Sequence, residues 1–212
     1  MTEPYKVVIV DDEMISRGYM ELFIKPSRRY EIAASLPFAA DALAWCRENT
    51  PPDLVILDVM MASGVDGLTA AGEIKRRYPQ VRVIVTTSMA DTDWLDRARD
   101  AGVESFWFKT YSSMSLLEVM DRTMAGEHVW PERPPEAMLG TARSSEFTDR
   151  ELEVLRYLSK GLSDKEIAER LHMGYSTVRY HIDNLMEKTG QTSRTALAVE
   201  AVLNGIIFPG IG

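Results

Sequence analysis

The sequence predicts an α/β protein in which a doubly wound sheet of five parallel strands is followed by a small all-α domain of four helices. Three observations predict this fold class. Five short apolar runs alternate with segments of helical periodicity over residues 1–125, which is the pattern of a parallel sheet with right-handed crossovers. Acidic residues directly follow two of these runs. From Thr148 onward every segment has helical periodicity, and a tight turn between two short helices indicates a helix-turn-helix.

The apolar runs predict the strands, because each run is short and bounded by turn residues. They cover residues 5–10, 32–36, 54–57, 82–86 and 105–108. The third run follows Pro51-Pro52, and its unbroken apolar character is typical of a strand buried on both faces. Asp58 comes directly after this run, at the carboxyl end of the strand, where open α/β sheets place their ligands and their chemistry.

The helices of the first 125 residues are expected between these strands. Asp91 is expected to cap the helix that precedes the fifth strand, and Ser113 or Ser115 to cap the helix that follows it. Residues 126–147 then break the pattern with three prolines and two glycines, which predicts a linker. Val129-Trp130 and Met138-Leu139 are apolar enough for this linker to dock on one of the domains.

The C-terminal domain, residues 148–212, begins with two capping boxes. Thr148 with Glu151 opens the first helix, and Ser163 with Glu166 opens the second. A three-residue turn at 172–174 leads to the third helix, and Thr192 or Ser193 caps the fourth. The chain is therefore divided into domains at 1–125 and 148–212, with a linker at 126–147.

Charge, cysteine content and the length of the apolar runs exclude several classes of protein. The net charge is −8, but residues 148–212 hold 8 basic and 9 acidic residues, so any basic surface there must be local. Cys46 is the single cysteine, which excludes an internal disulfide and a thiolate metal cluster. The sequence has neither a signal-peptide pattern nor an apolar run of roughly 20 residues, so a cytoplasmic protein without a membrane segment is expected.

The acidic residues predict a cation site. Asp11-Asp12 follow the first strand as Asp58 follows the third, and neighbouring parallel strands would bring these carboxylates to the same edge of the sheet. Three crowded carboxylates repel one another unless a cation lies among them.

These residues resemble a known family. The chain is similar to bacterial response regulators of the NarL/FixJ type, in which a CheY-like receiver with a flavodoxin-like sheet precedes a LuxR-type helix-turn-helix domain. On the receiver side the resemblance rests on Asp11-Asp12, Asp58, Asp66-Gly67, Thr87 and Lys109. On the DNA side it rests on the run FTDRELEVLRYLSKGLSDKEIAERLHMGYSTVRYHIDNLMEKTG. Two departures are Ala62, where the family usually has proline in a loop one residue shorter, and Thr110, where many receivers have proline.

The resemblance implies a transcription regulator rather than an enzyme. Asp58 would accept a phosphoryl group from a sensor histidine kinase, and Mg²⁺ would be held by Asp11, Asp12, Asp58 and the backbone carbonyl of Met60. Magnesium suits such a set because it takes about six oxygen ligands and neutralises a phosphoryl group in transfer.

The resemblance also implies roles for residues of the fourth and fifth strands. Lys109 would pair with the bound phosphoryl group, and the Thr87 hydroxyl would donate a hydrogen bond to it. Phe106 stands at the aromatic switch position, whose ring moves together with that hydroxyl.

The third helix of the C-terminal domain would read DNA. Its candidate contacts, with the residues that follow it, are Thr177, Arg179, Tyr180, Asp183, Asn184, Lys188, Thr192 and Arg194. Arg179 suits guanine, Asn184 adenine and Tyr180 a thymine methyl group, whereas Lys188, Thr192 and Arg194 suit phosphates. Asp183 either accepts from cytosine or holds Arg179 by an i,i+4 pair.

The expected partners are a histidine kinase and double-stranded DNA with two half-sites, bound as a homodimer through residues 194–204. Two alternatives stay open. One is a regulator that binds DNA without phosphorylation, and the other is a phosphotransfer protein or phosphatase on the same sheet. Singly, these residues also have structural explanations, since an aspartate at a strand end is often a cap and four capped helices can be a plain bundle.

Overall fold

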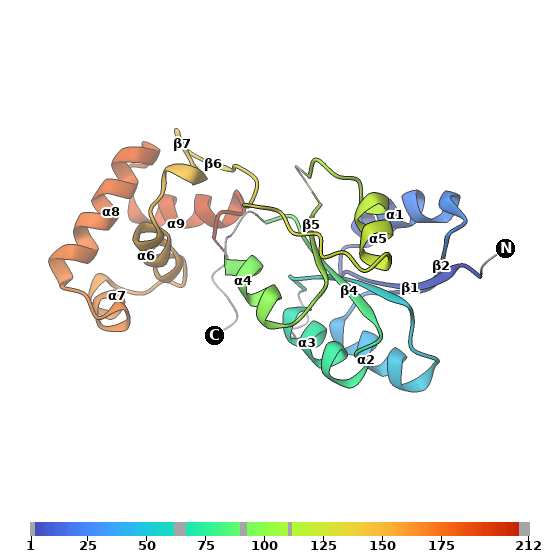
Figure 1. Ribbon diagram of the computed structural model, residues 1–212. Coiled ribbons are helices and arrows are strands. Elements are labelled where there is room, and N and C mark those ends of the chain that lie inside the picture. The colour runs from blue at the N-terminus through green and yellow to red at the C-terminus, as the bar shows by residue number, and fades with distance from the viewer. Residues whose placement is uncertain (1–2, 62–66, 90–92, 110–111, 208–212) are drawn as a thin grey trace. The chain divides into compact units, whose positions relative to one another are not determined.

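Two compact units follow one another along the chain in the computed structural model (Figure 1), which describes residues 3–61, 67–89, 93–109 and 112–207. The divide along the chain falls between Arg133 and Pro134, inside the stretch expected to be a linker. Within the described residues, no helix combines the length and the apolar character needed to cross a bilayer.

The first unit is a parallel sheet in the order β2-β1-β3-β4-β5, which confirms the predicted doubly wound fold. The strands begin and end within two residues of the expected runs. They are β1 (Tyr5–Val10), β2 (Tyr30–Leu36), β3 (Leu54–Asp58), β4 (Arg82–Thr87) and β5 (Ser105–Phe108). Every residue of β3 is buried, as its unbroken apolar run predicts.

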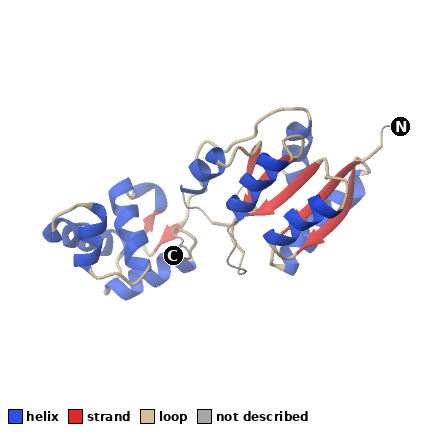
Figure 2. Cartoon of the chain, turned by 90° about the horizontal axis from the view of Figure 1, so that it is seen from below, coloured by secondary structure: helices blue, strands red, loops and turns tan. Residues whose placement is uncertain are grey.

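Helices cover both faces of this sheet (Figure 2). They are α1 (Met14–Ile24), α2 (Ala39–Glu48), α3 (Gly67–Arg77), α4 (Asp93–Asp100) and α5 (Leu116–Met124), with a short 3-10 helix, η1 (Lys25–Ser27), after α1. Buried residues of α1 and α5 pack together on one face against side chains of β1, β3 and β4. Ser115, rather than Ser113, caps α5 by accepting from the Glu118 amide, whereas the expected cap Asp91 lies outside the described residues.

The second unit is helical after a short hairpin, which confirms the predicted four-helix domain. Its elements are β6 (Met138–Leu139), β7 (Ala142–Arg143), the 3-10 helix η2 (Ser144–Glu146), α6 (Asp149–Ser159), α7 (Asp164–Leu171), α8 (Tyr175–Thr189) and α9 (Arg194–Leu203). Both predicted capping boxes are present, and Ser193 caps α9. His172 has a φ of 51° and ends α7 in the left-handed region, so the chain turns within three residues into α8.

Candidate functional site

Three carboxylates gather at the carboxyl edge of the sheet. Asp11 follows β1 and Asp58 ends β3, and the pairing of these two parallel strands brings both side chains to the same place. One carboxylate oxygen from each of Asp11, Asp12 and Asp58 lies within 4.8 Å of the others. Asp11 is fully buried and Asp58 is 5% exposed, so water solvates their charges poorly. The carboxylate cluster that the sequence predicts therefore exists, and its oxygen donors fit a hard divalent cation.

Lys109 joins the two buried acids. It follows β5, and its Nζ lies 2.5 Å from Asp11 Oδ2 and 2.6 Å from Asp58 Oδ1. The other oxygen of Asp58 accepts from the Met60 amide at 2.8 Å. Burial raises the pKa of Asp58 to about 7, and the charge of Asp11 adds to this effect, although the Lys109 ammonium opposes it. For Lys109, burial alone would lower the pKa, but the two carboxylates outweigh it and hold that pKa above its usual value.

Thr87 and Phe106 lie on the neighbouring strands β4 and β5. Thr87 is buried at the end of β4, and its carbonyl accepts from the Lys109 amide at 2.9 Å. Phe106 is 1% exposed, and its ring centroid is 5.0 Å from that of Phe108. Both residues are thus within the sheet that carries Asp58. Ala62, Asp66 and Thr110, on which other sequence expectations rested, lie outside the described residues.

Gly67 fixes the backbone beside Asp58. A Cβ at this position would come within 1.9 Å of the Asp58 carbonyl oxygen, a distance that no side chain can accept. The Gly67 amide donates to the Val59 carbonyl at 3.0 Å. The start of α3 is therefore held against the end of β3 at a point where only glycine fits.

The structure adds two residues that the sequence reasoning missed. The Ser16 hydroxyl donates to Asp11 Oδ2 at 2.5 Å, and the Arg17 guanidinium donates to the Asp11 carbonyl at 2.5 Å. Both belong to the first turn of α1, which begins three residues after Asp11. Helical spacing after an acidic pair was the one available signal, because the first turn of such a helix bends back toward the acids.

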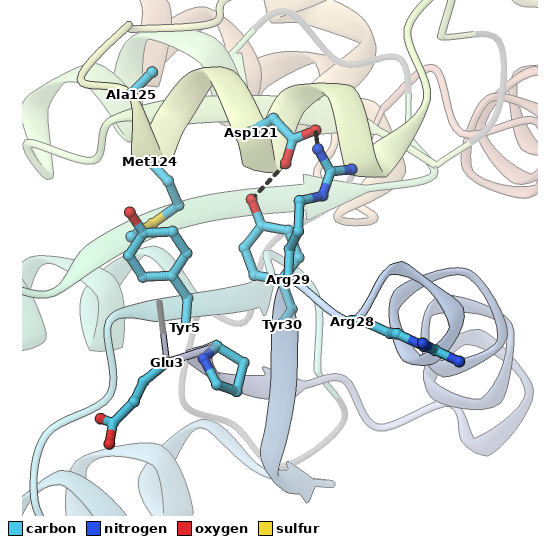
Figure 3. A pocket seen from close by; sticks show the side chains of 9 residues that line it. Glu3, Tyr5, Arg28, Arg29, Tyr30, Asp121, Met124 and Ala125 are labelled. Carbon is cyan, nitrogen blue, oxygen red and sulfur yellow. Dashed lines mark hydrogen bonds and ion pairs between the residues drawn. The ribbon is translucent and has the colours of Figure 1, made fainter. Parts of the chain in front are cut away.

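A surface pocket of about 530 Å³ lies at the other end of β1 and β2 (Figure 3). Three of its polar residues pair with one another: the Tyr30 hydroxyl donates to Asp121 at 2.8 Å, and Arg29 pairs with the second oxygen of Asp121 at 2.7 Å. Tyr5 and Tyr30, at the amino ends of their strands, line it. This pocket is therefore separate from the cluster of Asp11 and Asp58.

In the second unit, α8 presents a polar outer face. The inward residues are Val178, Ile182 and Leu185. Thr177, Arg179, Tyr180 and Asp183 are exposed and Asn184 is half-buried. The Tyr180 and His181 rings meet in a T-shaped arrangement, with centroids 5.7 Å apart. Arg179 and Asp183, both within the described residues, form no ion pair with each other, so nothing here holds Arg179 in one orientation.

Two of the candidate phosphate contacts have partners inside the unit. Lys188 lies 2.8 Å from Glu151 Oε2 and also donates to the Glu146 carbonyl at 3.0 Å. Arg194 lies 2.7 Å from Asp164 Oδ1 and donates to the Leu162 carbonyl at 2.8 Å. Thr192 is exposed. A phosphate contact by either cation would compete with a carboxylate that it already holds.

Comparison with known proteins gives two family matches in the order of the two units. The response regulator receiver domain matches residues 7–121, and the luxR family of bacterial regulatory proteins matches residues 145–201. The response regulator protein VraR of Staphylococcus epidermidis is 31% identical over 207 residues, which cover 95% of this chain and 98% of that protein. VraR proteins of Staphylococcus aureus match at the same identity and coverage.

Solved structures share the fold across both units. A structure of two RcsB dimers bound to two parallel DNAs has a TM-score of 0.61 at 20% identity, covering 94% of this chain and 98% of that chain. RcsB from Salmonella enterica serovar Typhimurium, bound to the promoter rprA in the presence of the phosphomimetic BeF3⁻, has a TM-score of 0.60 at 21% identity. That match covers 92% of this chain and 97% of the other.

Proposed function

The chain belongs to the bacterial response regulators of the NarL/FixJ type, which join a receiver domain to a LuxR-type DNA-binding domain, and from this membership we propose that phosphorylation of Asp58 controls its binding to DNA. It is a phosphorylation-controlled, DNA-binding regulator of a two-component system and belongs to a family of transcription factors, not of enzymes. The observation that carries the assignment of Asp58 is the Lys109 ammonium shared between Asp11 and Asp58 at the carboxyl edge of the sheet.

The transfer follows from the chemistry of this cluster. An oxygen of Asp58 attacks the phosphorus of a phosphohistidine on the sensor kinase, the P–N bond breaks, and the imidazole nitrogen takes the electron pair and then a proton. The product on Asp58 is an acyl phosphate. Lys109 moves its ammonium from the Asp58 oxygen to the phosphoryl oxygens, and the Thr87 hydroxyl donates to the same group. Both contacts stabilise charge that the transfer creates.

Magnesium is the cofactor of this proposal. Asp11, Asp12, Asp58 and the Met60 carbonyl would hold it, and the separation of the three carboxylates supports this set. Bound there, the cation would neutralise the negative charge of the phosphoryl group and of the acids around it. Ser16 and Arg17 keep Asp11 in place for this role through its carboxylate and its carbonyl.

Labelling by acetyl phosphate with Mg²⁺ tests the assignment of Asp58. Asp58→Asn is expected to abolish incorporation of the phosphoryl group, because the amide cannot act as the nucleophile. Asp53→Asn is the matched control, since Asp53 is an exposed acid just before the same strand. Undiminished labelling of Asp58→Asn, or its loss in Asp53→Asn, would overturn the assignment.

DNA reading by α8 is the second part of the proposal. Its exposed polar face supports base contacts by Thr177, Arg179, Tyr180, Asp183 and Asn184, with phosphate contacts by Thr192 and, in competition with their ion pairs, by Lys188 and Arg194. Arg179→Ala is expected to cost about 1–3 kcal/mol in binding and to relax the preference at one base pair of each half-site. Binding selection on randomised half-sites measures both effects.

Asp183 is tested by a double-mutant cycle with Arg179. Because the two side chains are not paired in the free protein, Asp183 orients Arg179 only if the pair forms on DNA. In that case Asp183→Ala changes affinity little once Arg179 is alanine. Additive losses would instead assign a base contact to Asp183 itself.

A homodimer, a histidine kinase and a cytoplasmic location complete the proposal. RcsB binds DNA as dimers in a structure that shares this fold, and Leu203 of α9 is 77% exposed, which supports α9 as the dimer contact. Leu203→Asp is expected to lower the DNA-bound dimer fraction in sedimentation experiments. Leu22→Asp, on α1 and 73% exposed, is the matched control. Loss of the dimer in the control alone would move the contact to the receiver.

A further inference from the structure

The segment at 126–133, here called the strap, lies along the free edge of the receiver sheet. β5 is the last strand of the sheet, so its outer edge pairs with no other strand of the described residues. The Phe106 amide donates to the Val129 carbonyl at 2.9 Å, and the Val129 amide donates to the Ser105 hydroxyl at 3.0 Å. Val129 is 5% exposed and belongs to the core between the sheet, α1 and α5. The strap therefore covers β5 as a short extra strand would.

Trp130 covers Phe106 next to this backbone contact. The two rings are stacked, with centroids 6.2 Å apart and an interplanar angle of 29°. The Arg99 guanidinium of α4 also lies over the Trp130 ring, 5.1 Å from its centroid. Phe106 is 1% exposed, and Trp130 of the strap covers part of its ring, so a movement of the Phe106 ring disturbs its contact with Trp130.

β5 also connects the strap to Asp58. The strand has four residues, and Lys109, which pairs with Asp58, follows its last residue directly. The Phe106 amide that the strap binds is only three residues before that lysine. A new charge on Asp58 draws the Lys109 ammonium to a new position, and so acts on a short strand whose other edge the strap holds.

We propose that the strap is the output element of the receiver: it is docked on β5 while Asp58 is unmodified and is released when Asp58 carries a phosphoryl group. This inference rests on the proposed function, since it takes Asp58 as the phosphoacceptor. The strap ends at Arg133, and Pro134 begins the DNA-binding unit, so a change in docking reaches that unit through one peptide bond. Trp130 is a positioning residue in this scheme, acting on Phe106.

Thermodynamic linkage makes the scheme testable. If the phosphoryl state loosens the strap, then loosening the strap must strengthen binding of a phosphoryl analogue by the same factor. Trp130→Ala removes the stacked ring and Arg99→Gln removes the cation above it. Both variants are expected to bind beryllofluoride with Mg²⁺ about 3-fold to 10-fold more tightly than the wild type. Trp45→Ala, in α2 and half-buried, is the matched control and should leave this affinity unchanged.

Hydrogen exchange of the full-length chain gives a second readout. Beryllofluoride should speed exchange of the Phe106 and Val129 amides about tenfold or more in the wild type, while the amides of β1 stay protected. Trp130→Ala should show fast exchange of these two amides without the analogue. Trp130→Ala could impair folding, so Arg99→Gln tests the same contact at an exposed residue, where a substitution leaves the fold intact.

The outcomes separate this inference from the proposed function. If beryllofluoride does not bind, the assignment of Asp58 fails and the strap mechanism fails with it. If it binds but leaves the Phe106 and Val129 amides as protected as before, the strap is a fixed part of the receiver and the inference alone is overturned. Unchanged affinity in both Trp130→Ala and Arg99→Gln would overturn it as well.

Discussion

Asp58 carries a charge that the folded receiver holds at a cost. Its pKa is raised to about 7 by burial and by Asp11, from the usual 3.8, so the folded state binds a proton more tightly than the unfolded state. Stability therefore falls as the pH rises from about 4 to about 7 and is level above that range. Asp58→Asn removes this loss. In EDTA at pH 8 the variant should be more stable than the wild type by about 1–3 kcal/mol.

Urea unfolding at several pH values measures this difference. The advantage of Asp58→Asn should shrink as the pH falls from 7 to 4, because the folded wild type then holds Asp58 protonated and no longer buries its charge. Mg²⁺ should raise the stability of the wild type more than that of the variant, because the variant lacks one of the three carboxylates. A stability difference independent of pH would contradict the raised pKa.

Single residues were predictable where strand ends determine their place. Asp11, Asp58 and Lys109 each follow a predicted strand, and parallel strands leave their carboxyl ends at one edge, so the sequence could assemble them. Lys188 and Arg194 were not predictable in the same way. Their carboxylate partners lie 37 and 30 residues away, and helical periodicity tells which face a residue occupies but not which helix it meets.

Between elements, an ion pair with a buried carboxylate joins α8 to α6 in the second unit. Glu151 is buried at the third position of α6, accepts from Thr148 in the capping box and pairs with Lys188 of α8. Lys188→Met leaves this buried carboxylate without its cation and should destabilise the unit by about 2–4 kcal/mol. Arg150→Met is the matched control, because Arg150 pairs with Glu153 at the exposed surface, where such a pair contributes about 0–1 kcal/mol.

A second substitution tests whether the unpaired charge of Glu151 causes the loss of stability in Lys188→Met. The double variant Glu151→Leu with Lys188→Met should recover part of the stability that Lys188→Met loses, since no unpaired charge then remains buried. Exchange of α6 and α8 amides under urea reports on this unit alone. Equal losses of unfolding free energy in Lys188→Met and Arg150→Met would show that burial of Glu151 does not strengthen its ion pair.

Local sequence rules predicted where the helices begin, but they did not predict where the linker docks. Both capping boxes formed as predicted, and the structure selected Ser115 and Ser193 where the sequence left a neighbour open. The linker composition predicted irregular chain with apolar residues able to dock. It could not indicate that Val129 would bind the edge of β5, because a backbone contact to an edge strand leaves no pattern in side chains.

For the whole molecule, the net charge is −8, so the salt dependence of DNA binding rests on the local cations of the second unit. Arg179 and Lys165 are exposed, whereas Lys188 and Arg194 hold internal carboxylates. If Arg179 and Lys165 are the cations that displace counterions in each of two chains, the slope of log K against log salt is about −4, and all four cations in each chain would give about −7. Titrations of the DNA-bound dimer from low to moderate salt measure the slope.

Substitution of single cations shows which of them contribute to the salt dependence of DNA binding. Lys165→Met should make it shallower by about 2, one released counterion in each chain of the dimer, and Arg194→Met should leave it nearly unchanged. Arg194 keeps its place because Asp164 and the Leu162 carbonyl both hold it, and DNA would have to displace both. A wild-type slope steeper than about −6, made shallower by Arg194→Met, would show that DNA takes Arg194 from Asp164 and that this ion pair is exchanged on binding.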